Sequence, residues 1–247
     1  MKSVQYKSLF SGPKLPALTK GSAVFHGIRR AILLREVDAG QPLIEQQIGR
    51  EFNCSQGTVR EALMRLQEEG LVQRRGYKGT FVLRSSIAEA AQMADIRIKL
   101  EVEGISRAVT VFEEPDLAEL DGYLQRMEKS YAEDDAYASS ELDRTFHLAI
   151  FQRSGLPALE PILKRCMLHM HMMTFGNPAY EVDPISPIEA HRPIMEALRA
   201  RDSQQAASAI RNHINEVASR WSPQLKSALD ALESGPGAST PPSGETS

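Results

Sequence analysis

Four side chains in the C-terminal half of the chain have the types and the spacing of a metal site. Asp143 and His147 stand four residues apart, which places them one above the other on one face of a helix. His191 follows 44 residues after His147, and His213 another 22 residues later. Both lie in segments with helical periodicity, and a helix bundle can direct such side chains to one point in its core.

Three neutral imidazoles and one carboxylate favour a divalent transition metal, with Zn or Ni expected first, over Mg or Ca. An isolated Asp/His pair at this spacing also occurs as a surface or capping pair, so the pair alone does not decide. A metal with an open coordination position can activate water, and a metal-dependent hydrolase-like enzyme is therefore the alternative function. Because no further Glu or His has an assignable role as a base, we predict a protein that is not an enzyme.

The segment that carries these residues reads as helices separated by clear breaks. The breaks are Glu114-Pro115, Gly155-Leu156-Pro157 and a Pro-rich connection from Gly176 to Pro187. The apolar stripes between them have the period of helices, and we find no convincing strand. We predict an all-helical domain over residues 87–232, with about six helices at roughly 87–111, 116–133, 135–153, 157–175, 187–201 and 203–230.

Residues 22–84 have a different pattern, which predicts a winged helix-turn-helix. Ser22 is expected to cap the first helix, and a second helix runs from about 45 to 52. After a tight connection, a third helix covers 56–69, with Ser55 at its N-cap and Gly70 just beyond its end. Two short runs, 71–75 and 80–83, flank a glycine-bearing turn and read as a basic β-hairpin. The predicted fold class is therefore mainly α, with this domain followed by the helical bundle.

The third helix can bury one face and present the other to DNA. Val59, Ala62, Leu63 and Leu66 form the apolar face, while polar residues of the first turn remain free for base edges in a major groove. The hairpin can reach the phosphate backbone or a minor groove. A helical subdomain with solvated charges is the alternative. The expected DNA contacts are Gln46, Ser55, Gln56, Gly57, Thr58, Arg60, Arg65, Arg75 and Lys78.

The distribution of charge supports this division of the chain. Residues 1–84 contain 14 Lys and Arg against 7 Asp and Glu, a net charge of +7, whereas residues 85–247 contain 15 against 25, a net charge of −10. A basic N-terminal third indicates a polyanionic partner. We expect a flexible arm over residues 1–21 and a disordered tail over 233–247, which is rich in Gly, Pro, Ser and Thr.

The run TVREALMRLQEEGLV, within residues 22–83, resembles the DNA-binding domain of GntR-type bacterial transcription regulators. Gln46, Gln56 and Gly57-Thr58 depart from the residues frequent in that family. Glutamine prefers adenine where arginine reads guanine, so the operator is expected to differ from the usual family site. Arg60 is retained and is the first choice for a DNA contact.

The helical half resembles the FCD ligand-binding domain of the FadR subfamily. The resemblance rests on Asp143-Arg-Thr-Phe-His147, on His191 in EAHRPIMEALRARD, on His213 in RNHI, and on Arg97-Ile-Lys-Leu-Glu101. It implies that Asp143 and the three histidines bind the metal. Gly155-Leu156-Pro157 stands where the family often has an asparagine.

Together these features predict a ligand-responsive regulator that binds operator DNA as a homodimer. A small organic acid is expected as the effector, with Arg97 either pairing with its carboxylate or bridging Glu101 one helical turn away. His169 and His171, in a Met-rich run, are expected to pack in the core. Two cysteines form no disulfide framework, no apolar run has the length of a membrane span, and we expect a cytoplasmic protein.

Overall fold

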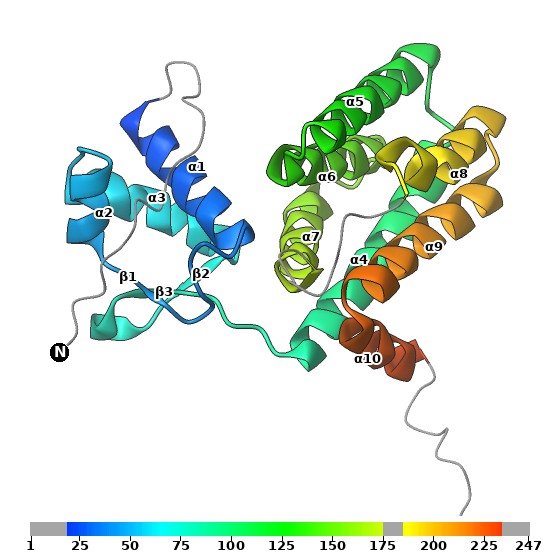
Figure 1. Cartoon of the computed structure of the whole chain (residues 1–247). Helices are drawn as coiled ribbons and strands as arrows, with labels where there is room; N and C mark the ends of the chain where they lie inside the picture. Colours follow the sequence, from blue (N-terminus) through cyan, green and yellow to red (C-terminus); the bar gives the residue numbers. More distant parts are fainter. Residues whose placement is uncertain (1–18, 175–184, 234–247) are drawn as a thin grey trace, which may run out of the picture.

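The computed structural model describes residues 19–174 and 185–233, which form two lobes joined near residues 83–86 (Figure 1). The small lobe contains the first three helices and a sheet, and the large lobe contains the remaining helices. Most of the predicted arm, tail and Pro-rich connection lies outside the described residues, and there those expectations remain predictions. At the inner ends of the predicted arm and tail the expectation was wrong, because Lys20 and Gly21 belong to the first helix and Glu233 to the last.

The small lobe is a winged helix-turn-helix, as predicted. Strand β3 lies between β1 and β2 and pairs antiparallel with both, with Gln73 opposite Phe81 in the hairpin. Val24, Ile28, Val59, Leu63 and Leu66 are buried in its core, so the predicted apolar face of the third helix is confirmed. Its elements are α1 (Lys20–Leu33), β1 (Pro42–Leu43), α2 (Glu45–Glu51), α3 (Gln56–Glu68), β2 (Val72–Arg74), the 3-10 turn η1 (Gly76–Lys78) and β3 (Thr80–Val82).

The ends of α3 are those expected from the sequence, whereas the start of α1 is not. The Ser55 side chain accepts a hydrogen bond from the backbone N–H of Thr58, and Gly70 follows the helix with φ +78°. The prediction that Ser22 caps α1 was wrong, because the Thr19 side chain accepts from the Ser22 N–H and the helix already begins at Lys20. Strand β1 was not predicted, since two residues including a proline give no alternating pattern.

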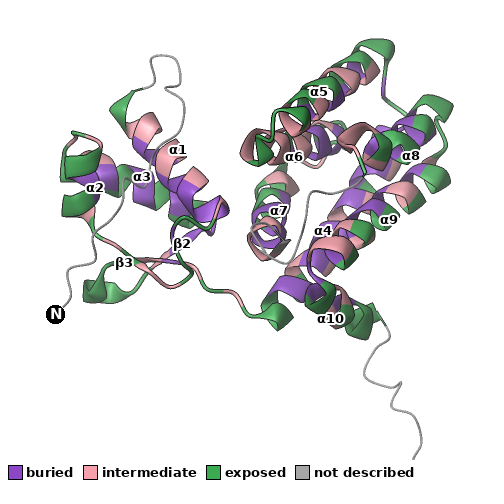
Figure 2. Cartoon of the chain, in the orientation of Figure 1, coloured by how far each residue is buried: buried purple, intermediate pink, exposed green. Residues whose placement is uncertain are grey.

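The large lobe is built around the long helix α4, which runs between α6 and α7 on one side and α9 and α10 on the other (Figure 1). Its core is continuous from Ala90 on α4 to Leu229 on α10, and the buried faces turn inward in both lobes (Figure 2). Its helices are α4 (Ile87–Ala108), α5 (Glu114–Ala132), α6 (Ala136–Gln152), the 3-10 turn η2 (Pro157–Leu159), α7 (Glu160–Thr174), α8 (Pro187–Ala200), α9 (Ser203–Trp221) and α10 (Pro223–Glu233).

One predicted helix of the bundle is two helices. The sequence pattern continued to residue 230, but α9 ends at Trp221 and α10 starts at Pro223. Between them Ser222 has φ −156° and ψ 80°. Proline cannot donate the helical hydrogen bond, and its ring clashes with the carbonyl of the preceding turn. The described residues of this lobe therefore contain seven α-helices where six were predicted.

The two lobes meet through α1 and α3 on one side and α6 and α7 on the other. Arg29 of α1 is 10% exposed and forms ion pairs with Glu69, at 2.9 Å, and with Glu141 of α6, at 2.5 Å. Leu168 of α7 joins the small lobe's core. Burial would lower the pKa of Arg29, but Glu141 and Glu69 outweigh it and raise this pKa. The guanidinium therefore ties the end of the third helix to α6.

Candidate metal centre and DNA interface

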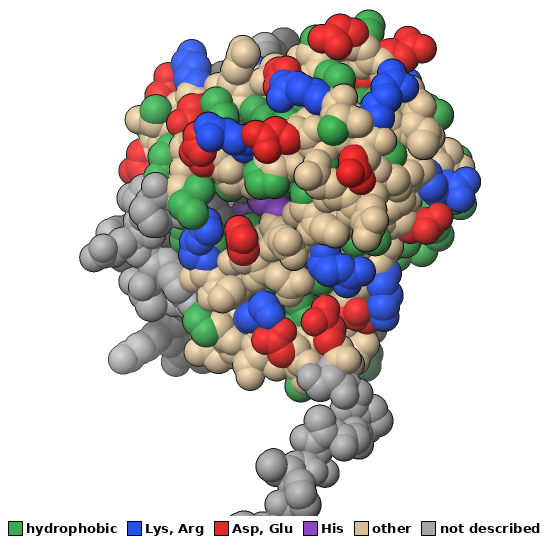
Figure 3. Space-filling view, turned by 90° about the vertical axis from the view of Figure 1, so that its right-hand side faces the viewer, with side chains coloured by type: hydrophobic (Ala, Val, Ile, Leu, Met, Phe, Trp, Pro, Cys, Tyr) green, Lys and Arg blue, Asp and Glu red, His purple; other side chains and the backbone are tan. Residues whose placement is uncertain are grey.

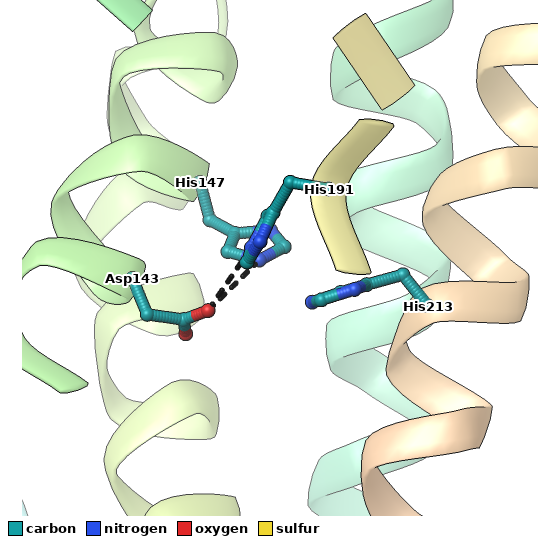
Figure 4. Close-up of side chains that lie close together, drawn as sticks. All are labelled: Asp143, His147, His191 and His213. Carbon is teal, nitrogen blue, oxygen red and sulfur yellow. Dashed lines mark hydrogen bonds and ion pairs between the residues drawn. The ribbon is translucent and has the colours of Figure 1, made fainter. Parts of the chain in front are cut away.

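The four residues predicted as metal ligands lie together in the large lobe (Figure 4). One ligand atom from each of Asp143, His147, His191 and His213 can be chosen so that all four atoms lie within 4.8 Å of one another. The three histidines are at most 6% exposed, and the Asp143 side chain retains 33% exposure. Metal bonds of about 2.0–2.2 Å to imidazole or carboxylate need donors about 3–4 Å apart, so a small contraction would complete the site.

Three capped helices carry these side chains. Asp143 and His147 are on α6, His191 is on the second turn of α8, and His213 is on α9. Each of these helices starts with a side-chain cap, from Asp135, Ser186 and Asp202 respectively. Such caps satisfy free N–H groups and fix where a helix begins. The register of each ligand is therefore set by local sequence.

The Nδ1 atom of each histidine contacts an oxygen acceptor. His147 Nδ1 is 2.5 Å from a carboxylate oxygen of Glu101, His191 Nδ1 is 2.7 Å from the Pro187 carbonyl, and His213 Nδ1 is 3.2 Å from the Ala190 carbonyl. Because carbonyl oxygens and ionised carboxylates only accept, each Nδ1 carries the proton. The Nε2 atoms of His147 and His191 lie 3.7 Å and 3.2 Å from Asp143 Oδ1.

Burial and the neighbouring charges favour the ligand-competent protonation states of Asp143 and His213. Desolvation opposes ionisation of Asp143, but His147, His191 and His213 outweigh it and hold its pKa well below the usual value. Desolvation, together with the neighbouring His191 and His147, holds the pKa of His213 well below its usual value. An ionised carboxylate and a neutral imidazole are the forms that bind a metal.

A hollow on the surface of the large lobe reaches a histidine side chain. Figure 3 views this lobe from the right-hand side of Figure 1 and shows a small purple histidine area at the floor of the hollow. This histidine is therefore within reach of a small molecule that enters the hollow, whereas a side chain sealed in the core is not.

Arg97 pairs with Glu101 one helical turn away, which is the second of the two arrangements expected from the sequence. Its Nε atom is 2.6 Å from Glu101 Oε1, and its side chain is 7% exposed. One terminal nitrogen lies 3.2 Å from the Met170 sulfur. Arg97 therefore lies directly behind the cluster, joined to it through Glu101. The sequence did not single out Glu101 as part of the site, because only the fold brings a residue of α4 next to His147.

His169 and His171 of α7 do not join the metal cluster. His169 Nδ1 contacts the Ser85 hydroxyl at 3.1 Å, and His171 Nδ1 contacts Arg144 at 3.0 Å. Desolvation lowers the pKa of both, and of His171 strongly, with Arg144 adding to the effect. Their packing between helices agrees with the core role expected from the sequence.

The residues expected to contact DNA lie on the surface of the small lobe. Thr58 is half-buried, and the other eight are exposed. Three arginines have protein partners: Arg60 Nε is 2.6 Å from Glu45, and the guanidinium carbons of Arg65 and Arg75 lie 3.9 Å and 4.8 Å from the ring centres of Phe25 and Phe81. These contacts hold the guanidinium groups at the surface in defined positions.

Sequence reasoning missed three residues that share this surface. Lys20, Arg50 and Asn53 line an open hollow of about 480 Å³ together with Gln46, Ser55 and Gln56. Lys20 donates to the Asn53 carbonyl at 2.8 Å. Arg50 and Lys20 add positive charge beside the N-terminus of α3, where free N–H groups favour a phosphate. Arg50 could have been found as a basic residue ending α2, whereas Lys20 approaches only through the fold.

A winged helix-turn-helix followed by an all-helical domain indicates a DNA-binding transcription regulator. Two family descriptions match in this arrangement: "Bacterial regulatory proteins, gntR family" over residues 20–82 and "FCD domain" over residues 92–216. The chain belongs to the GntR family of transcription regulators, in the group with an FCD domain.

Individual relatives cover most of the chain. It is 28% identical over 209 residues to the HTH-type transcriptional repressor RspR of Escherichia coli, covering 82% of this chain and 89% of that protein. It is 26% identical over 216 residues to the gluconate operon transcriptional repressor of Bacillus subtilis, covering 85% and 88%. The structure of E. coli McbR/YncC matches with a TM-score of 0.68 at 21% identity, covering 84% of this chain and 99% of that chain, and supports the fold.

The relatives are named as regulators, which favours a regulator over the hydrolase-like alternative. Among the described residues, no helix combines the length and the apolar character needed to cross a membrane.

Proposed function

We propose that this regulator binds a divalent transition metal at Asp143, His147, His191 and His213, and that the metal takes part in sensing a small organic acid. The convergence of four donors from three helices carries the proposal. His147 Nε2 supports it, because this buried atom has no hydrogen-bond partner among the described residues. A buried polar atom left in this way costs free energy unless something binds it. Three nitrogens and one oxygen suit Zn or Ni.

The organic acid is proposed because of charge. The chain after residue 84 has a net charge of −10, so an anion entering its core needs a local cation. When bound, the metal would supply that positive charge and open coordination positions for carboxylate oxygens. Arg97 is the alternative anchor, although its Nε is already paired with Glu101.

DNA binding is proposed through the N-terminal part of α3 and the wing. The expected contacts are those of the exposed surface described above, with Arg60 first. One winged domain reads only a half-site, so we propose a homodimer on a palindromic operator. The effector would then shift the relative placement of the two DNA-binding lobes.

Metal analysis of the purified protein tests the central part. The wild type should hold about one ion per chain, and His213→Ala should lose it and lower the Tm, because binding to the folded state alone is stabilising. His169→Ala is the matched control, since His169 lies outside the cluster. Full occupancy in His213→Ala would remove His213 from the ligand set.

Chelation tests the effector. If the acid binds the metal, its affinity in calorimetry should collapse in chelator-treated protein, whereas an acid anchored by Arg97 should instead lose affinity in Arg97→Ala. Equal affinity in metal-loaded and metal-free protein would place the effector elsewhere.

A further inference from the structure

Glu101 lies behind His147 in the core of the large lobe and is not one of the proposed ligands. It is on α4, its side chain is 3% exposed, and its two oxygens have different partners. Oε2 lies 2.5 Å from His147 Nδ1, and Oε1 lies 2.6 Å from Arg97 Nε. The three residues form a line from Arg97 through Glu101 to the imidazole that faces the metal centre.

The donor and acceptor chemistry of Arg97, Glu101 and His147 determines which of their atoms carry protons. Arginine only donates hydrogen bonds, and an ionised carboxylate only accepts them. Glu101 therefore accepts on both oxygens, and His147 carries its proton on Nδ1. A neutral imidazole protonated at Nδ1 has its lone pair on Nε2, and this atom faces Asp143 at 3.7 Å.

We propose that Glu101 is a positioning residue that fixes the tautomer and the orientation of His147 for metal binding, with Arg97 holding the carboxylate in place. The inference rests on the metal site proposed above. His191 and His213 have neutral backbone carbonyls behind them, so in the described contacts the charged acceptor belongs to His147. A carboxylate behind a ligand imidazole orients the ring and increases its basicity.

Glu101→Gln gives a sharp test, because it preserves the shape of the side chain. Arg97 can only donate, so the amide oxygen should turn to Arg97 and the amide NH₂ to His147. His147 Nδ1 must then accept, which moves the ring proton to Nε2, where the metal would bind. Two-bond ¹H–¹⁵N spectra of chelator-treated protein at pH 8 report this tautomer, with His147→Gln used to assign the signal. We expect Nδ1–H in the wild type and Nε2–H in Glu101→Gln.

Metal affinity gives the second readout, measured with Zn²⁺ or Ni²⁺ in competition with a chromophoric chelator. Glu101→Gln should weaken binding about 10–100-fold, the usual effect of losing the hydrogen-bond partner of a metal-binding histidine. Glu103→Gln is the matched control, since Glu103 is on the same helix but 60% exposed and pairs with Arg107. It should bind the metal as the wild type does.

A second variant keeps the test valid if the glutamine destabilises the lobe. Arg97→Met combined with Glu101→Leu removes both buried charges together, a change that is often tolerated. With no acceptor behind it, His147 should populate both tautomers and bind the metal more weakly than in the wild type.

The outcomes separate the inference from the metal site itself. If the wild type binds metal and His213→Ala does not, then an unchanged His147 tautomer or wild-type affinity in Glu101→Gln overturns the role of Glu101 alone. If neither the wild type nor His213→Ala binds the metal, both the proposed metal site and the positioning role of Glu101 are refuted.

Discussion

At the scale of single residues, Arg60 is the side chain on which DNA recognition should depend most. It is exposed on α3, and its ion pair with Glu45 fixes its position at the surface. Arg60→Ala should weaken operator binding by about 1–3 kcal/mol if the arginine contacts a base, or reduce the salt slope by about one if it contacts a phosphate.

Operator titrations at several salt concentrations distinguish these two cases. Arg199→Ala is the control, because Arg199 is also an exposed arginine in an ion pair but lies in the large lobe. Identical titration curves for wild type and Arg60→Ala at every salt concentration would exclude Arg60 from the interface.

His171 makes the stability of the protein dependent on pH. Desolvation and the nearby Arg144 hold its pKa well below 6.5 in the folded chain, whereas the unfolded chain takes up this proton near pH 6.5. Below that pH the unfolded state binds more protons, so the free energy of unfolding falls as pH falls and is unaffected above it. Urea unfolding of metal-free protein between pH 8 and 5.5 should show this loss.

His171→Gln isolates the contribution of this residue. Its stability profile should be flatter below pH 6.5, by up to about 1.4 kcal/mol per pH unit. His213 and His169 also have lowered pKa values, so part of the acid sensitivity should remain. Parallel profiles for the two proteins would show that folding does not lower the pKa of His171.

At the scale of elements, the sharp end of α3 depends on Gly70. Its φ of +78° lies in the left-handed region, and an added Cβ would lie 2.6 Å from Arg165 Nε of α7. Gly70→Ala should destabilise the protein by about 1–2 kcal/mol from the backbone alone.

Gly122→Ala is the matched control, since Gly122 lies within α5 with nothing within 4 Å of an added Cβ. It should stabilise by about 0.5–1 kcal/mol, and thermal unfolding measures both. Equal melting temperatures for Gly70→Ala and wild type would contradict the role given to Gly70.

The same elements show what the sequence could predict and what it could not. Ser55 and Gly70 act through neighbours in the chain, so their roles at the two ends of α3 were readable. The break at Ser222 was missed because apolar periodicity continued across Pro223, and the proline alone decides the end of α9. Strand β1 exists only because Pro42 and Leu43 meet β3.

The residues at the proposed metal site also differ in how far the sequence could predict them. The spacing of Asp143 and His147 is local, and the later histidines could be placed on their helices by periodicity and by family resemblance. Glu101 is 46 residues from His147, and its spacing from Arg97 resembles an ordinary helical ion pair. Only the packing of α4 against α6 brings its second oxygen to the imidazole.

At the scale of the whole molecule, the contact between the lobes joins α6, which carries two of the proposed metal ligands, to the end of α3. Glu141 pairs with Arg29, which also holds Glu69 at the end of α3. Glu141 pairs with Arg144 as well, and it lies two residues before Asp143 on the same helix. A small shift of α6 on metal or effector binding would therefore act on α1 and α3 directly.

Glu141→Gln should uncouple the two functions while keeping each of them. In the wild type, removing the metal should change operator affinity by a factor in the usual range for coupled sites, about 5–150-fold. In Glu141→Gln this factor should approach one, because the amide keeps the shape of the side chain but loses the charge that attracts Arg29. Metal affinity should remain, since Glu141 contacts none of the four proposed ligands in the described hydrogen bonds and ion pairs.

Operator titrations with and without chelator measure this factor. Asp121→Asn breaks the exposed pair with Arg199 and controls for the loss of a carboxylate in the same lobe. If Glu141→Gln keeps the full wild-type factor, the coupling does not run through this contact and must use α7 or the segment that joins the lobes.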